Sequence, residues 1–125
     1  MNKNRLIPIF TTSGETGAYL MYPYIYNRLG EWVGWVTKSR EVYSVKGRYV
    51  GYLAKGPRIL RKRSLSSYRT EQTPPVKPPG RINVPVMGPL APLMPELSFA
   101  EIDVLGDEPE RLHTLDMGEL RDDMD

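Results

Sequence analysis

Residues 30–36 read GEWVGWV, and residues 47–53 repeat this pattern seventeen positions later as GRYVGYL. A looser copy, GETGAYL, occupies residues 14–20. A two-residue element that begins with Ile or Val precedes each copy and follows the last one: Ile9-Phe10, Ile25-Tyr26, Val42-Tyr43 and Ile59-Leu60. The second residue of each pair lies four positions before the start of the next unit, which is Gly14, Gly30, Gly47 or Ser64. This constant offset indicates an internal repeat.

Each unit is predicted to be a β-hairpin. Its Val, Ile, Tyr and Trp residues favour strands, and they alternate with the period of two that a strand requires. The turns at residues 11–14, 27–30 and 44–47 each end in Gly, which adopts the positive φ of a short hairpin turn without a clash at Cβ. Since one hairpin cannot bury its apolar face alone, we expect about four hairpins to pack radially into a small all-β domain. The fourth would return through residues 65–68, and it is degenerate because Ser64 replaces the glycine.

The alternation also predicts which side chains form the core. Trp32 and Val36 should share one face of their strand, and Val33 and Trp35 the other. We expect an inner layer around a shared axis and an aromatic second layer: Leu20, Val36 and Leu53 in the first, and Tyr19, Trp35 and Tyr52 in the second. The aromatic layer could bind a ligand, but we favour the interpretation that it is simply core. A small residue recurs in the middle of each repeat and predicts a close approach of another segment there: Ala18, Gly34 and Gly51.

This pattern resembles that of the bacterial four-fold β-flower proteins, in which a Gly-x-x-Val-Gly-aromatic-aliphatic segment alternates with an aliphatic-Tyr segment. Residues 30–43 and 47–60 fit it well, whereas residues 14–26 carry Gly17-Ala18 in place of Val-Gly. The resemblance covers residues 5–68 and implies a shallow, radially symmetric arrangement of hairpins. Residues 97–101, LSFAE, are also similar to a short segment near the end of the Pro-rich tails of such proteins. No established activity comes with the resemblance.

The composition divides the chain into three parts: the hairpin domain (residues 1–68), a Pro-rich linker (residues 69–95) and an acidic tail (residues 96–125). Both Trp and all eight Tyr precede residue 69, and nine of the twelve Pro follow it. For the linker we expect extended polyproline structure or disorder. Pro75 and Pro78 have the spacing of a PxxP ligand, although a plain linker is the interpretation we favour.

Charge is divided as unevenly as proline. Residues 1–68 hold twelve Lys and Arg against three Glu, a balance of +9, and residues 69–125 hold five against twelve acidic residues, a balance of −7. This asymmetry predicts either an anionic partner for the first part, such as a lipid surface or nucleic acid, or contact between the two parts. A solvated basic surface is the alternative. The candidate anion-binding residues are Arg58, Arg61, Lys62 and Arg63.

A short docking motif is predicted in the tail. Residues 98–101, SFAE, have the pattern of a helix capping box, and the apolar residues around them are Leu97, Phe99, Ile102 and Leu105. Because so short a helix is unstable alone, we expect it to fold on a protein partner or on the hairpin domain itself. A second candidate helix starts at Asp107, but for residues 107–125 we favour a disordered acidic tail; its apolar residues are Leu112, Leu115 and Leu120.

The residues that enzymes use are scarce. The chain has no Cys, its only histidine, His113, lies in the tail, and residues 1–68 contain no Asp. A nucleophile–histidine–carboxylate site therefore cannot form in the hairpin domain. We predict a protein that is not an enzyme, with no catalytic residue, no cofactor and no metal site.

The favoured function is a non-enzymatic binding or scaffolding module that recruits a protein partner through its C-terminal tail. The alternative is binding of an anionic surface, either membrane lipid or nucleic acid, by the basic hairpin domain. No apolar run approaches the roughly 18 residues of a membrane span. The start of the chain does not resemble a signal peptide, so we expect a cytoplasmic protein.

Overall fold

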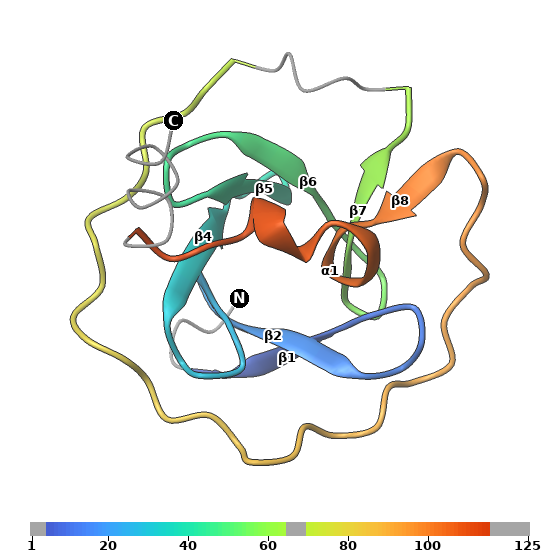
Figure 1. Cartoon of the computed structure of the whole chain (residues 1–125), viewed down its shortest axis with the longest axis horizontal. Coiled ribbons are helices and arrows are strands. Elements are labelled where there is room, and N and C mark those ends of the chain that lie inside the picture. The colour runs from blue at the N-terminus through green and yellow to red at the C-terminus, as the bar shows by residue number, and fades with distance from the viewer. Residues whose placement is uncertain (1–4, 65–69, 116–125) are drawn as a thin grey trace.

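The computed structural model describes residues 5–64 and 70–115; the predictions that concern residues 65–68 and Leu120 fall outside them. The described chain forms one antiparallel sheet whose eight strands are neighbours in chain order (Figure 1). The strands are β1 (Ile7–Phe10), β2 (Thr16–Met21), β3 (Tyr24–Tyr26), β4 (Trp32–Val36), β5 (Glu41–Ser44), β6 (Tyr49–Ala54), β7 (Arg58–Lys62) and β8 (Glu101–Asp103). Two short helical segments follow β8: α1 (Val104–Asp107) and the 3-10 turn η1 (Pro109–Arg111). The predicted all-β arrangement of hairpins followed by short helical segments is confirmed.

Three of the four hairpins form where the repeat predicts them, as the pairs β1–β2, β3–β4 and β5–β6. In the second hairpin, Asn27 N donates to Glu31 O at 2.9 Å and Gly30 N donates to Asn27 O at 3.1 Å. The glycine at the end of each turn has a positive φ: +97° at Gly14, +80° at Gly30 and +84° at Gly47. A side chain at these positions would be strained, which explains why glycine recurs there.

The two strands of the second and third hairpins stay bonded one residue beyond their paired positions. Leu53 N donates to Arg40 O at 2.8 Å, and an equivalent bond occurs one repeat earlier. Phe10 N donates to Pro57 O at 2.9 Å and so links the first strand to the turn between β6 and β7. The bond from Phe10 holds the first strand against the turn before β7, and the sheet curls into a half-barrel (Figure 1).

The fourth pair takes its second strand from the acidic tail. β7 pairs with β8, with Arg61 opposite Ile102 and Lys62 opposite Glu101. The strand that completes the fourth hairpin is therefore supplied by the tail, far along the chain from the degenerate turn. The hairpin domain and the tail thus share one sheet.

The helix predicted to start at Ser98 is wrong. Ser98 begins a turn, in which Ala100 N donates to Ser98 Oγ and Glu101 N donates to Ser98 O, both at 3.0 Å. The chain then enters β8, and the helix starts only after Asp103, whose side chain accepts from Gly106 N. A capping-box pattern is compatible with a turn as well as with a helix. Here strand pairing with β7 provides the hydrogen bonds that an isolated short helix holds only weakly.

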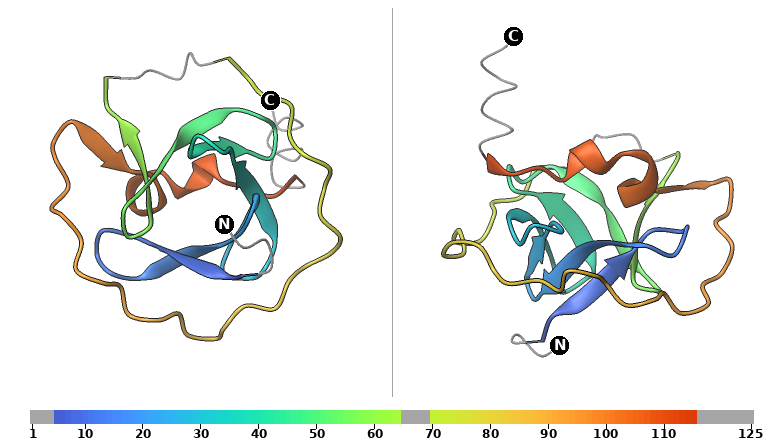
Figure 2. Two further views of the ribbon diagram at one scale, coloured as in Figure 1. Left: turned by 180° about the vertical axis from the view of Figure 1, so that it is seen from behind. Right: turned by 60° about the horizontal axis from the view of Figure 1, so that its bottom comes forward.

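The Pro-rich segment forms a belt, defined as residues 70–98, that runs around the outside of the sheet (Figures 1 and 2). It is bonded to the hairpins one after another. Gln72 N donates to Gly47 O at 2.9 Å, and Ile82 N donates to Gly30 O at 3.0 Å. Farther along the belt, the carbonyl of Pro89 accepts from the first hairpin. Of the two expectations for this segment, an ordered extended structure is the one found.

A β-bulge in each of the first three hairpins changes the predicted faces. Between β3 and β4, Ile25 lies opposite Gly34 but Tyr26 lies opposite Trp32, so Val33 is an extra residue. The equivalent extra residues in the other two hairpins are Gly17 and Val50. A bulge breaks the alternation of side chains. The prediction that Val33 lies on the face opposite Val36 is therefore wrong, and both side chains belong to the central cluster.

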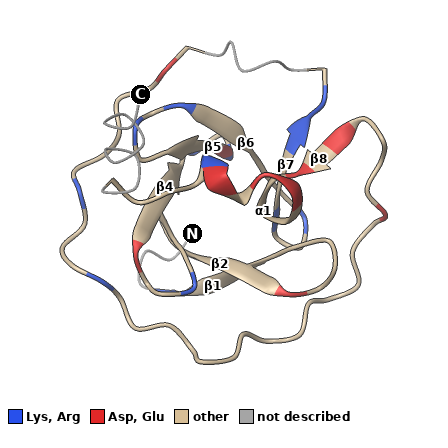
Figure 3. Cartoon of the chain, in the orientation of Figure 1, with Lys and Arg blue, Asp and Glu red and all other residues tan. Residues whose placement is uncertain are grey.

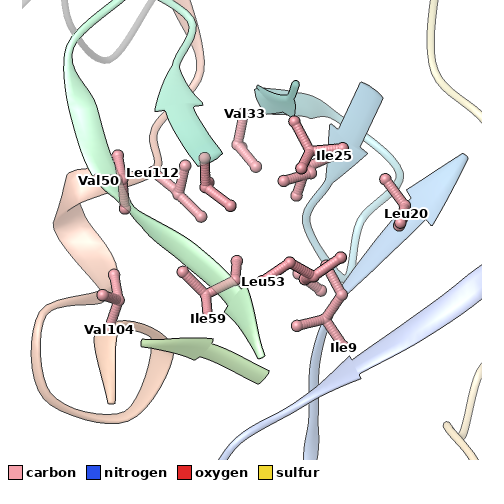
Figure 4. Close-up of a cluster of buried hydrophobic side chains, with 12 residues drawn as sticks. Ile9, Leu20, Ile25, Val33, Val50, Leu53, Ile59, Val104 and Leu112 are labelled. Carbon is pink, nitrogen blue, oxygen red and sulfur yellow. The ribbon is translucent and has the colours of Figure 1, made fainter. Parts of the chain in front are cut away.

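The central cluster lies on the concave side of the curled sheet (Figure 4). The first residue of every two-residue element is fully buried in it: Ile9, Ile25, Val42 and Ile59. Leu20, Val36 and Leu53 belong to the same cluster. The recurrent small residues allow another strand to approach closely, as predicted: a Cβ on Gly34 would lie only 2.6 Å from Tyr43 O of the neighbouring strand.

Candidate functional site

The four candidate anion-binding residues do not form one exposed patch. Arg58 and Arg61 are only 3% and 6% exposed. Arg58 Nη1 donates to Thr12 Oγ1 at 3.2 Å, and its Nη2 donates to Pro95 O of the belt at 3.1 Å. Arg61 Nη2 forms an ion pair of 2.7 Å with Glu108 Oε1. Both arginines therefore fasten the C-terminal part of the chain to β7.

The other two basic residues are exposed but also face the tail. Arg63 Nε donates to Phe99 O at 2.9 Å, and the guanidinium carbon of Arg63 lies 4.8 Å from the centre of the Phe99 ring. Lys62 lies opposite Glu101 in the sheet. Acidic residues of β8 and α1 thus lie beside the basic strand β7 (Figure 3). Of the predicted outcomes of the charge asymmetry, contact between the two parts is what these residues show.

Two acidic residues anchor the C-terminal segment. Glu108 Oε1 accepts from Arg61 Nη2 and from Arg111 Nε, both at 2.7 Å. Burial alone would raise the pKa of Glu108, but the hydrogen bonds from the two arginines lower it below its usual value. Asp103, which is buried, accepts from Thr12 N at 2.6 Å.

The predicted docking motif packs on its own domain. Ile102 is buried in β8, Leu105 packs against Gly17 of the first hairpin, and Leu97 is half-buried. Phe99 differs from them because it is 86% exposed. The motif therefore packs on the hairpin domain, but as a turn and a strand and not as the predicted helix.

The C-terminal segment closes one open end of the half-barrel (Figures 2 and 4). Val104 and Leu112 are buried and belong to the central cluster. A Cβ on Gly34 would lie 2.7 Å from Leu112 Cδ2, so the small residue of the second repeat makes room for this leucine. Residues 104–112 therefore complete the core that the hairpins leave open.

The three residues predicted to form an aromatic second layer do not form one cluster: Trp35 packs with Tyr26, Trp32, Tyr43 and Tyr49, and neither Tyr19 nor Tyr52 belongs to that cluster. Trp35 stacks on Tyr43 with ring centres 5.0 Å apart and donates from Nε1 to Ser44 O. Tyr19 is buried, whereas Tyr52 is half-buried and donates its hydroxyl hydrogen to Glu101 Oε2. Burial, together with the Glu101 carboxylate, raises the pKa of Tyr52 to about 12. Trp35 and Tyr52 therefore make contacts within the fold.

The remaining candidate surface lies on the outside of the belt. We define its outer apolar face as Met87, Leu90 and Leu93. Leu90 and Leu93 are fully exposed and Met87 is 84% exposed, although the belt that carries them is bonded to the hairpins. No charged residue occurs between positions 82 and 95. The site is therefore an ordered, uncharged apolar strip in contact with solvent.

Sequence reasoning missed this face. Pro78, which together with Pro75 has the spacing of a PxxP ligand, is buried and lines a small cavity beside Trp32. The signal that could have revealed the outer face is the spacing of Pro89, Pro92 and Pro95, which recur every three residues. A three-residue period is that of the polyproline II helix.

The single histidine of the chain, His113, contacts the backbone beside it. Nδ1 of His113 lies 2.9 Å from Thr114 O. Within residues 5–64 and 70–115, no three or more His, Asp or Glu side chains are placed to hold a metal ion. None of the helices described is long and apolar enough to cross a membrane.

Comparison with known protein families gives a match over most of the chain. A family model described as "4-fold beta flower protein" matches residues 7–111. No curated protein and no solved structure shows a significant match to the chain. The matched region includes the belt and β8 as well as the hairpins, in agreement with a sheet that is completed from the tail.

Proposed function

The chain belongs to the 4-fold beta flower protein family, and on that premise we propose that it is a non-enzymatic binding module that recruits a protein partner through the outer apolar face of its belt. The observation that carries this proposal is the exposure of Met87, Leu90 and Leu93 on an ordered segment. Contiguous apolar side chains at the surface of a folded protein mark interaction sites.

The belt is suited to binding because it is already held in place. Thr16 Oγ1 donates to Pro89 O at 3.3 Å and Arg58 Nη2 donates to Pro95 O at 3.1 Å, on either side of Leu90 and Leu93. A partner therefore gains the apolar contact without the entropic cost of ordering the segment. The absence of charge between residues 82 and 95 supports an apolar partner surface over an anionic one.

This proposal places the recruiting residues upstream of the predicted docking motif. Leu97, Ile102 and Leu105 make contacts within the fold, which makes them poor candidates for a second partner. The prediction placed recruitment in the C-terminal tail, residues 96–125, and this proposal moves it to the belt. We further propose that the protein is cytoplasmic.

The proposal that the module is not an enzyme is supported by three of its carboxylates, which form hydrogen bonds within the fold. Glu108 and Asp103 anchor the C-terminal segment, and Glu101 binds the hydroxyl of Tyr52. Each of these groups therefore has a structural contact.

Site-specific photo-cross-linking in the full-length protein tests the proposal. A benzoylphenylalanine at position 90 should form an adduct with a defined protein, whereas the same group at exposed position 77 should not. Unlabelled wild-type protein should compete for the adduct, and the Leu90→Ser/Leu93→Ser variant should not. Equal competition by both proteins would contradict recruitment through this face.

A second candidate function, binding of an anionic surface, is favoured by one observation. Arg40 and Lys55 are exposed and line a shallow hollow together with Leu20 and Leu53. Cations around an apolar hollow are suited to an anionic lipid surface. Full-length protein should then bind vesicles that contain phosphatidylserine, and the Arg40→Gln/Lys55→Gln variant should bind them less. No binding at low salt would exclude this function, because screening is weakest there.

A further inference from the structure

We propose that the partner reads residues 87–95 as a left-handed polyproline II helix, through a groove lined with aromatic side chains. This inference rests on the function proposed above and specifies the class of partner. It follows from a three-residue period in the sequence of the belt, which is also the period of the exposure of its side chains and of its hydrogen bonds to the hairpins.

A polyproline II helix has three residues per turn and therefore three edges. The first edge carries the outer apolar face, the second carries prolines, and the third carries small or flexible residues. In the order of the chain these are Met87, Leu90 and Leu93; Pro89, Pro92 and Pro95; and Gly88, Ala91 and Met94.

The structure distinguishes these edges by their surroundings. All residues of the first and second edges are exposed, whereas Ala91 and Met94 of the third are half-buried. Gly88 lies so close to Thr16 that a Cβ at this position would clash with the threonine. Met94 lies against the turn before β7, because its Sδ would be 2.8 Å from a Cβ on Gly56. The third edge therefore faces the hairpins, and the other two form a ridge towards solvent.

The hydrogen bonds to the belt have the same period. Pro89 and Pro95 both offer their carbonyl oxygens to the hairpin domain, to Thr16 and Arg58 respectively. These prolines are six residues apart, which is two turns of a polyproline II helix, so their carbonyls point in the same direction. The backbone bends at Val86 and Met87, where the segment begins, and contains no further turn or bend from residue 88 to residue 98.

The chemistry of the ridge specifies the groove. Proline rings and leucine side chains alternate along it, with a repeat of about 9 Å per turn. Grooves that bind polyproline II segments are lined with aromatic rings, between which such residues insert. Since the ridge carries no charge, binding should depend little on ionic strength.

Titration with isolated polyproline-reading domains tests the inference. Full-length protein with labelled leucine methyl groups is titrated with an SH3, a WW and an EVH1 domain. At least one should bind and move the methyl signals of Leu90 and Leu93 upfield, because the methyl groups then lie over aromatic rings. The Leu90→Ser/Leu93→Ser variant should bind at least tenfold more weakly.

Val76→Ser provides the matched control. Val76 is an apolar belt residue that is 85% exposed but lies outside the periodic segment, so its substitution should leave the affinity unchanged. The inference is overturned if no domain shifts the Leu90 and Leu93 methyl signals at millimolar concentration, or if Val76→Ser weakens binding as much as the leucine substitutions. Cross-linking at position 90 that persists in that case would retain the proposed function and reject only the polyproline mode; loss of the specific cross-link would reject the proposed function itself.

Discussion

Gly30 and Ile82 meet through their backbones: Ile82 N donates to Gly30 O at 3.0 Å, and the Ile82 carbonyl oxygen occupies the space that a Cβ on Gly30 would fill. Gly47 and Gln72 repeat this contact one hairpin along, with a hydrogen bond of 2.9 Å. The absence of a side chain at these two turn glycines therefore has a second effect: it allows the backbone of the belt to approach the hairpin turns.

The three turn glycines therefore differ in the cost of an alanine. Gly14 has the same kind of positive φ, but a Cβ there would meet nothing within 4 Å. Gly14→Ala should cost only the backbone strain, about 1 kcal/mol. Gly30→Ala and Gly47→Ala should each cost about 2–4 kcal/mol, because they also displace the belt and break its hydrogen bond. Urea unfolding of the three variants measures the difference, and equal losses would show that the belt contributes no stability at these turns.

The core contribution of the C-terminal segment can be tested at one residue. Leu112 is 8% exposed and packs over Gly34 in the central cluster. Leu112→Ala should lower the free energy of unfolding by about 2–4 kcal/mol, since it leaves a cavity that the rigid sheet cannot fill. Leu93→Ala, at a fully exposed position, is the control and should change stability by less than about 0.5 kcal/mol. Thermal or urea denaturation followed by tryptophan fluorescence reports both values.

A chain that ends at residue 98 should not fold cooperatively. It lacks β8 and the buried side chains of Ile102, Val104 and Leu112, so β7 loses one of its two strand partners and the central cluster stays open. A synthetic peptide of residues 99–115 should restore the fold in trans, as shown by amide dispersion in NMR spectra. Cooperative unfolding of the truncated chain without the peptide would contradict a sheet that depends on the tail.

The sequence was sufficient for the local part of this fold. The repeat predicts three hairpins, their turns and the glycines at positive φ, because each depends on residues close together in the chain. It does not predict β8, since a three-residue strand carries no periodic signal and its partner β7 lies about forty residues away. A similar distance applies to Arg61, which the sequence predicts as a surface cation but which is buried and paired with Glu108.

The β-bulges could not be predicted from the alternation of apolar residues within a hairpin. Alternation assigns Val33 and Val36 to opposite faces, and one inserted residue places both in the core. The spacing of the prolines in the belt could have predicted the outer apolar face. Its orientation could not be predicted, because it depends on the hairpins that bind the other edge of the belt.

Stability at acid pH should depend on Glu108. Because the folded state lowers its pKa, Glu108 contributes stability above the pKa of the unfolded chain, near 4.3, and loses it as pH falls through the lower folded value. Glu108→Gln should therefore cost on the order of 2 kcal/mol at pH 7, with the difference from wild type shrinking below about pH 4. Glu110→Gln, at an exposed neighbouring position, should leave the urea midpoint unchanged. A Glu108→Gln difference that is constant across this pH range would contradict the ion pair with Arg61.

Tyr52 gives the corresponding prediction at alkaline pH. Burial and the Glu101 carboxylate raise its pKa from 10.0 to about 12, so the folded state favours the neutral phenol. The stability that this group contributes is fully present below pH 10 and is lost as pH rises through about 12. Glu101→Gln removes the negative charge beside the hydroxyl and should lower the pKa of Tyr52, which the Cζ chemical shift of labelled tyrosine reports in a pH titration. Because burial is the larger cause, the pKa should remain above 10.0 in the variant. An unchanged pKa would mean that Glu101 does not bind Tyr52 in solution and that this contact between β6 and β8 is not formed.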